Sequence, residues 1–148
     1  MALDIEAVQA ALYARLTGSI TGLKSTTRIL IGYDALSSAQ KPAMVVVSER
    51  AQAHNDNVHA QLWTLTAIVV FYVQVEQGVV PETALFGFIK QAETALAHQN
   101  NEPWLDAKSA TSLGGLVRYA RIRDHEIHHG AGTRLAAATL TIEMLALE

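Results

Sequence analysis

The longest alternating pattern in the chain lies at Gln61–Val75, with the sequence QLWTLTAIVVFYVQV. Every second residue from Trp63 to Val75 is apolar, and the other register includes glutamine, threonine and tyrosine. Period-two alternation rich in β-branched and aromatic residues predicts a strand with one buried face. At about 3.3 Å per residue the strand would reach about 50 Å, which exceeds the usual strand length. We therefore expect it to bend, to bulge or to extend from its domain as an arm.

A second strand pattern precedes this one. Ala43–Glu49 (AMVVVSE) predicts a strand that starts just after Pro42. The polar stretch Arg50–Ala60 separates the two patterns, so we expect an antiparallel hairpin with an extended, mobile loop. Further upstream, Arg28–Tyr33 (RILIGY) is expected to form a short edge strand or a loop segment.

Two more strand patterns follow near the other end of the sequence. Leu116–Ile127 and Leu135–Leu147 surround His128–Thr133, whose glycines suit a turn. In the second pattern the even positions from Ala136 to Ala146 are all apolar, which predicts one buried face.

Apolar residues at helical spacing predict two helices. The first covers residues 4–16, with Asp4 placed to cap it and Gly18 placed to stop it. The second begins at Pro81, a favoured first helical residue, and runs to about His98. In the connector that follows, we expect Trp104 to plug the edge of the core.

This order of elements predicts a single α+β domain over residues 1–148. We expect a mostly antiparallel sheet of four to five strands, with long hairpins and both helices packed on one face. Three strand patterns are longer than a monomer of this size needs. Their surplus apolar surface must be covered, which indicates contact between subunits.

Composition narrows the class of protein. Half of the 148 residues are hydrophobic and 17% are charged, which indicates a globular chain. The formal net charge of −3 argues against a general nucleic-acid binder. The absence of cysteine excludes disulfides, thiolate nucleophiles and cysteine-based zinc sites. Because neither a signal peptide nor an apolar run of about 20 residues occurs, we expect a soluble protein.

The segment His125–His129 (HEIHH) matches the zinc motif H-E-x-x-H. In that motif, two histidines four apart on one face of a helix bind the metal. Here the preceding LVRYARIRD has no helical stripe and glycines follow at once, so we expect a strand. On a strand the two histidines would lie roughly 13 Å apart, too far to share a metal. We therefore interpret the segment as a polar hairpin end and keep a zinc hydrolase as the minor alternative.

Other motifs for catalysis fail on their surroundings. No nucleophile elbow surrounds Ser48, Ser109 or Ser112, and no G-K-[ST] follows Gly114 and Gly115 to make a phosphate loop. The sequence predicts no catalytic residue, no cofactor site and no metal site, and we expect the protein not to be an enzyme.

The C-terminal hairpin and the loop near residues 50–60 carry the candidate contact residues. Mixed charges at hairpin ends set register and partner choice between subunits, and the alternative is a solvated strand surface. Alternation places arginines three apart on opposite faces, so the hairpin arginines do not all share one patch. The candidate interface residues are Arg50, His54, Asp56, His59, Arg118, Arg121, Arg123, His125 and His128.

The order of elements, rather than a motif, resembles a known family. An N-terminal amphipathic helix, the strand AMVVVSE, the long QLWTLTAIVVFYVQV strand, the helix PETALFGFIKQAETAL and the closing hairpin GLVRYARIRDHEIHHGAGTRLAAATLTIEML are similar to the tail terminator (tail completion) proteins of long-tailed bacteriophages. The similarity covers nearly the whole chain, and no individual residue is carried over from the family.

The resemblance implies a structural virion protein without a cofactor. Such proteins form a hexameric ring at the head-proximal end of the tail tube, stop tube polymerisation and meet the neck or head-completion proteins. DNA would pass through the lumen without specific binding, and assembly would take place in the host cytoplasm. The alternatives are another ring-forming neck or tail subunit, such as a stopper or tube protein, and a small enzyme with zinc at HEIHH.

Overall fold

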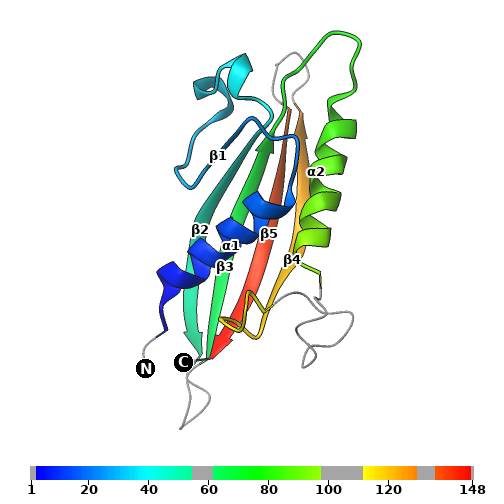
Figure 1. Ribbon diagram of the computed structural model, residues 1–148. Helices are drawn as coiled ribbons and strands as arrows, with labels where there is room; N and C mark the ends of the chain where they lie inside the picture. Colours follow the sequence, from blue (N-terminus) through cyan, green and yellow to red (C-terminus); the bar gives the residue numbers. More distant parts are fainter. Residues whose placement is uncertain (1–2, 55–61, 98–111, 130–135, 148) are drawn as a thin grey trace.

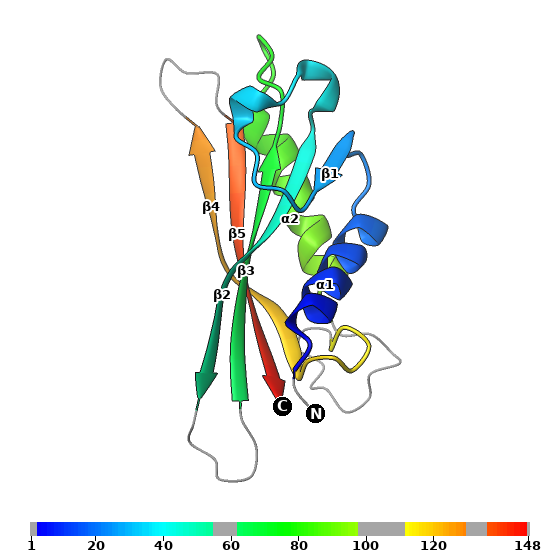
Figure 2. The ribbon, with the colours of Figure 1, turned by 90° about the vertical axis from the view of Figure 1, so that its left-hand side faces the viewer.

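The computed structural model describes residues 3–54, 62–97, 112–129 and 136–147 (Figures 1 and 2). In these parts the chain has two α-helices and a five-stranded mixed sheet, which confirms the predicted α+β class. In chain order the elements are α1 (Ile5–Ser19), β1 (Ser25–Thr27), the 3₁₀ turns η1 (Tyr33–Ala35) and η2 (Ser38–Gln40), β2 (Ala43–His54), β3 (Leu62–Tyr72), α2 (Pro81–Ala95), β4 (Tyr119–His129) and β5 (Ala136–Leu147).

The strands lie in the order β1-β2-β3-β5-β4. The predicted hairpins β2–β3 and β4–β5 are joined by antiparallel pairing of β3 with β5, which makes these two strands the centre of the sheet. The short strand β1 adds to β2 in parallel, with Ser25–Thr27 beside Ala43–Val45. Four long strands therefore alternate in direction across the sheet.

Both helices cover the same face of the sheet, as Figure 2 shows. The odd-numbered residues of β3 and the even-numbered residues of β5 lie beneath them, which confirms the buried faces predicted from alternation. At the centre, Phe71 of β3 stacks on Phe88 of α2 with ring centroids 5.5 Å apart. Each large side chain buried in this way contributes about 1.5–3 kcal/mol of transfer free energy.

A second, smaller cluster lies on the opposite face of the sheet. The segment between β1 and β2 folds over this face, where Leu36 packs against Val45, Tyr72 and Ala137. The hydroxyl of Tyr72 donates to the carbonyl of Ile31 at 3.0 Å. The sequence predicts packing elements on one face only, so this partial third layer adds to the predicted two-layer fold.

Several predicted boundaries are wrong. Strand β3 ends at Tyr72 rather than Val75, and β4 covers Tyr119–His129 rather than Leu116–Ile127. The N-terminal edge strand is Ser25–Thr27, which pairs with the start of β2, and residues 28–32 form a loop, the second of the two alternatives expected for Arg28–Tyr33. Residues 50–54 are not loop but the second half of β2, because they continue the ladder with β3 beyond a bulge at Glu49. A second bulge occurs in β4 at Arg123. Each bulge shifts the alternation by one residue, and the bulge in β2 hid the second half of that strand from a strict period-two reading.

The helix ends follow local hydrogen bonds. Asp4 caps α1 as predicted, since its Oδ1 accepts from the amide of Ala7 at 3.0 Å. The helix continues past Gly18 because the amide of the buried Ile20 still donates to Leu16 at 3.0 Å. Helix α2 begins at Pro81 as predicted. Trp104 and most of its connector lie outside the described residues.

Candidate assembly surfaces

A row of polar residues crosses the sheet on the face opposite the helices. The ladders align Arg50 of β2, Thr66 of β3, Glu143 of β5 and Arg121 of β4. Glu143 lies between the two arginines and accepts from Arg121 Nη2 at 2.9 Å. The hydroxyl of Tyr119 donates to the same Glu143 oxygen at 3.1 Å. Two predicted contact residues, from strands far apart in the sequence, thus share one row.

The electrostatics of this row are set by the partners of Glu143. Burial alone would raise the pKa of Glu143, but hydrogen bonds from Arg121 and Tyr119, with the charges of Arg121 and Arg123, lower that pKa below its usual value. The pKa of Tyr119 is raised by burial and by its hydrogen bond to the carboxylate. Glu143 is therefore a fixed negative charge between cations at neutral pH.

The other predicted contact residues do not gather in one place. Arg123 occupies the β4 bulge, 3.8 Å from the carboxylate of Asp124. His125 pairs with Leu140 on the helix side of the sheet, whereas His128 pairs with Ala137 on the opposite side. Arg118 precedes β4, and its amide donates to Leu145 at 2.7 Å. His54 is the last residue of β2, and Asp56 and His59 lie outside the described residues.

The HEIHH segment lies in strand β4, as predicted from the lack of a helical stripe. His125 and His129 are therefore separated by four strand residues, roughly 13 Å, instead of one helical turn. Within residues 3–54, 62–97, 112–129 and 136–147, no group of three histidine, aspartate or glutamate side chains is placed to bind a metal.

Two long strand edges remain unpaired in the described part of the chain. Strand β2 pairs with β1 only over Ala43–Val45, so its outer edge is free from Val46 to His54. Strand β4 is the last strand on the other side and is free along its outer edge. The two edge strands run in opposite directions. The free β2 edge of one copy can therefore pair with the free β4 edge of another copy as antiparallel strands.

Exposed apolar side chains mark two further surfaces that the sequence patterns did not predict. Ile29 and Leu30 follow β1, and Val79, Val80 and Phe86 lie just before α2 or in its first two turns. Between 54% and 74% of the surface of each residue is exposed. The exposure of Phe86 could have been predicted because Phe86 lies off the apolar stripe of its helix. Val79 and Val80 could have been noticed because they are apolar residues between a predicted strand and a predicted helix.

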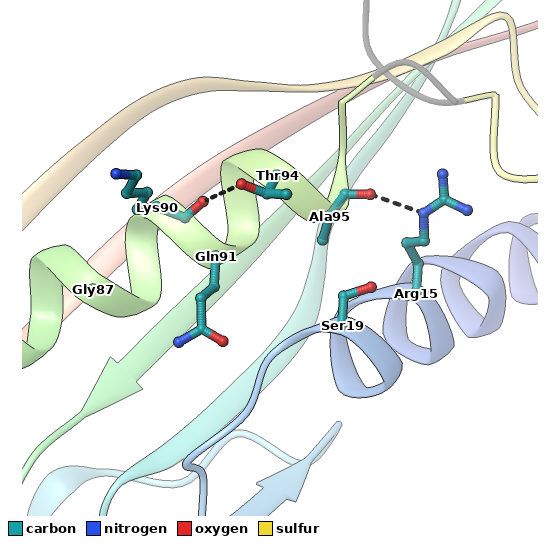
Figure 3. Close-up of a pocket in the computed structure, with 7 residues that line it drawn as sticks. All are labelled: Arg15, Ser19, Gly87, Lys90, Gln91, Thr94 and Ala95. Carbon is teal, nitrogen blue, oxygen red and sulfur yellow. Dashed lines mark hydrogen bonds between the residues drawn. The ribbon is translucent and has the colours of Figure 1, made fainter. Parts of the chain in front are cut away.

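A groove of about 510 Å³ separates the C-terminal half of α1 from α2 (Figure 3). Several of its polar groups already make bonds within the fold. Arg15 Nε donates to the carbonyl of Ala95 at 2.8 Å, and the hydroxyl of Thr94 donates to Lys90 at 3.0 Å. Gln91 accepts from the amide of Thr21 at 2.8 Å. The bonds of Arg15 and Gln91 tie α1 and the following turn to α2.

No described helix is long and apolar enough to cross a membrane. No family model matches the sequence, and the search of curated proteins gives no match either.

Proposed function

We propose that this protein is a ring-forming structural subunit, the tail terminator of a long-tailed bacteriophage. The observation that carries the proposal is the pair of free edges on β2 and β4. A ring requires a heterologous interface, in which one surface of each copy meets a different surface of the next. Two strand edges on opposite sides of one sheet, with opposite strand directions, meet that requirement.

The layer structure indicates which face would line the ring. Helices cover one face of the sheet, and the other face carries the row of Arg50, Thr66, Glu143 and Arg121. We propose that the helices lie on the outside and that this row faces the lumen. Its mixed charges and the chain's net charge of −3 suit passage of DNA without tight binding.

The proposed role needs no catalytic residue, cofactor or metal. The ring, expected to be a hexamer, would bind the end of the tail tube on one side and a neck or head-completion protein on the other. It would stop elongation by covering the subunits to which further tube protein adds. The protein would then reside at the neck of the virion after assembly in the host cytoplasm.

The proposal is tested first by mass in solution. Light scattering after size exclusion, at several concentrations and salt levels, should show a closed oligomer near six times the 16.0 kDa monomer mass. Added to polymerising tube protein, the ring should shorten the tubes and be seen at one end by electron microscopy. Unchanged tube lengths and bare tube ends would contradict the terminator role.

The free edges suit a second candidate equally well, namely another ring-forming neck or tail subunit such as a stopper or tube protein. The position of the ring separates a tube protein from a terminator or a stopper. Immunogold labelling along the whole tail would indicate a tube protein, whereas a single label at the head-proximal end would support a terminator or stopper.

A further inference from the structure

We infer that the two exposed apolar surfaces contact each other between adjacent copies of this chain. Ile29 and Leu30 form the β1-side patch, and Val79, Val80 and Phe86 form the α2-side patch. In the assembly, the β1-side patch of one copy packs on the α2-side patch of the next. This inference rests on the proposed ring and assigns the residues that hold its subunits together.

Both patches lie at the same end of the sheet. Strand β1 pairs with Ala43–Val45, and these residues pair in turn with Val70–Tyr72 at the end of β3. The chain continues from Tyr72 through the loop that carries Val79 and Val80 into α2. Figure 1 shows the segment after β1 and the start of α2 near the same end of the molecule. When copies stand side by side with parallel sheets, the β1-side patch of one copy would therefore lie at the same height as the α2-side patch of the next.

The patches lie on opposite sides of the molecule. Strand β1 is the outermost strand beyond β2, whereas α2 packs on β3, β5 and β4 toward the other edge (Figure 1). A contact between them is heterologous, because each copy offers a different surface to each neighbour. It also lies beside the free edges of β2 and β4, so the apolar contact and the strand pairing would form one continuous interface.

Each patch is held in place before any partner binds. Arg28 donates to the carboxylate of Glu6 in α1 from Nη1 at 2.6 Å and from Nη2 at 3.2 Å, and the amide of Ile29 donates to the hydroxyl of Thr27 at 2.9 Å. Val80 is the residue that caps α2, and Phe86 stands on that helix. Ordering these side chains therefore costs less entropy at assembly than ordering a flexible loop.

The experiment uses two full-length variants, each with one patch made acidic. Ile29→Asp with Leu30→Asp removes the β1-side patch. Val80→Asp with Phe86→Glu makes the α2-side patch acidic beside Val79, and aspartate is favourable at the N-cap position that Val80 occupies. The control is Ala10→Glu with Ala14→Glu, which adds two charges to exposed positions of α1 outside both patches.

We expect the control to form the same ring as the wild type and each patch variant to stay at the monomer mass of 16.0 kDa. An equal mixture of the two patch variants should form a dimer and nothing larger, because each variant keeps the patch that the other has lost. Circular dichroism melts verify that all variants are folded.

Three outcomes would overturn the inference. Patch variants that assemble like the wild type, a mixture that stays monomeric, or a wild type that stays monomeric at every concentration would each contradict a contact between the two patches. The proposed function fails differently, by a ring that leaves the tube end bare. Normal capping of tubes by assembled patch variants would reject the inference and leave the function in place.

Discussion

Arg121 and Glu143 are bound across strands β4 and β5, with Arg121 Nη2 2.9 Å from Glu143 Oε1. The same carboxylate accepts from Tyr119, and it lies directly across Thr66 from Arg50. The row therefore couples an outer strand to the centre of the sheet through one acidic residue.

Replacing Glu143 with glutamine should lower the free energy of unfolding by about 0.5–1 kcal/mol at pH 7. Because the pKa of Glu143 is lowered in the folded protein, the unfolded chain takes up a proton at a higher pH than the folded chain does. The stabilisation by the Glu143 carboxylate is therefore complete above about pH 4.5, the usual glutamate pKa. It is lost as the pH falls through the lower pKa that Glu143 has in the folded protein.

Urea denaturation of the wild type and Glu143→Gln between pH 3 and pH 8 measures this difference. Glu126→Gln is the control, because the exposed Glu126 is 4.0 Å from His128 and makes no shorter ion pair in the described residues. A stability difference that grows at acid pH would contradict the assignment.

Two phenylalanines of α2 should respond in opposite ways to truncation. Phe88 is buried and stacks on Phe71, so Phe88→Ala should cost about 3–5 kcal/mol of unfolding free energy. Phe86 is exposed, so Phe86→Ala should change the stability of the monomer by less than about 0.5 kcal/mol. Thermal melts report stability and light scattering reports assembly, and only Phe86→Ala should weaken assembly without loss of monomer stability.

Two glycines offer a matched test of backbone conformation. Gly87 lies inside α2 with open space where an added methyl group would stand, so Gly87→Ala should stabilise the protein by about 0.5–1 kcal/mol. Gly115 has a φ of +94° in the turn before β4, so Gly115→Ala should destabilise by about 1–2 kcal/mol. Chemical denaturation of both variants measures the difference, and equal effects would contradict the assigned turn.

The histidines of the HEIHH segment should be dispensable for folding. Alanine at both His125 and His129 should leave the circular dichroism spectrum and the assembly largely intact, because β4 places the two residues roughly 13 Å apart. Metal analysis of the purified wild type gives an independent check. Zinc in stoichiometric amount, lost in the double variant, would contradict the strand interpretation of the motif.

Residues with strong alternation or helical spacing predicted the fold well. Trp63–Phe71 and Ala136–Ala146 gave the correct buried faces, and Asp4 and Pro81 gave the correct helix starts. The failures have local causes. The bulge at Glu49 interrupted the alternation of β2, and β1 is three residues long and depends on pairing with Ala43–Val45.

The candidate surfaces were less predictable, because they depend on which distant residues the sheet aligns. Arg50 and Arg121 share a row only through β3 and β5, a relationship that no local pattern contains. Likewise, Ile29 and Leu30 are apolar in the sequence like any core residue, and only the fold shows that neither is covered within the described chain.

The position of β5 bears on how the chain reaches this fold. Strand β5 follows every other strand in the sequence, yet it lies between β3 and β4. During synthesis, one edge of β3 has no pairing partner until the whole segment from α2 to β5 has been made. Such non-local pairing slows folding and exposes strand edges to aggregation.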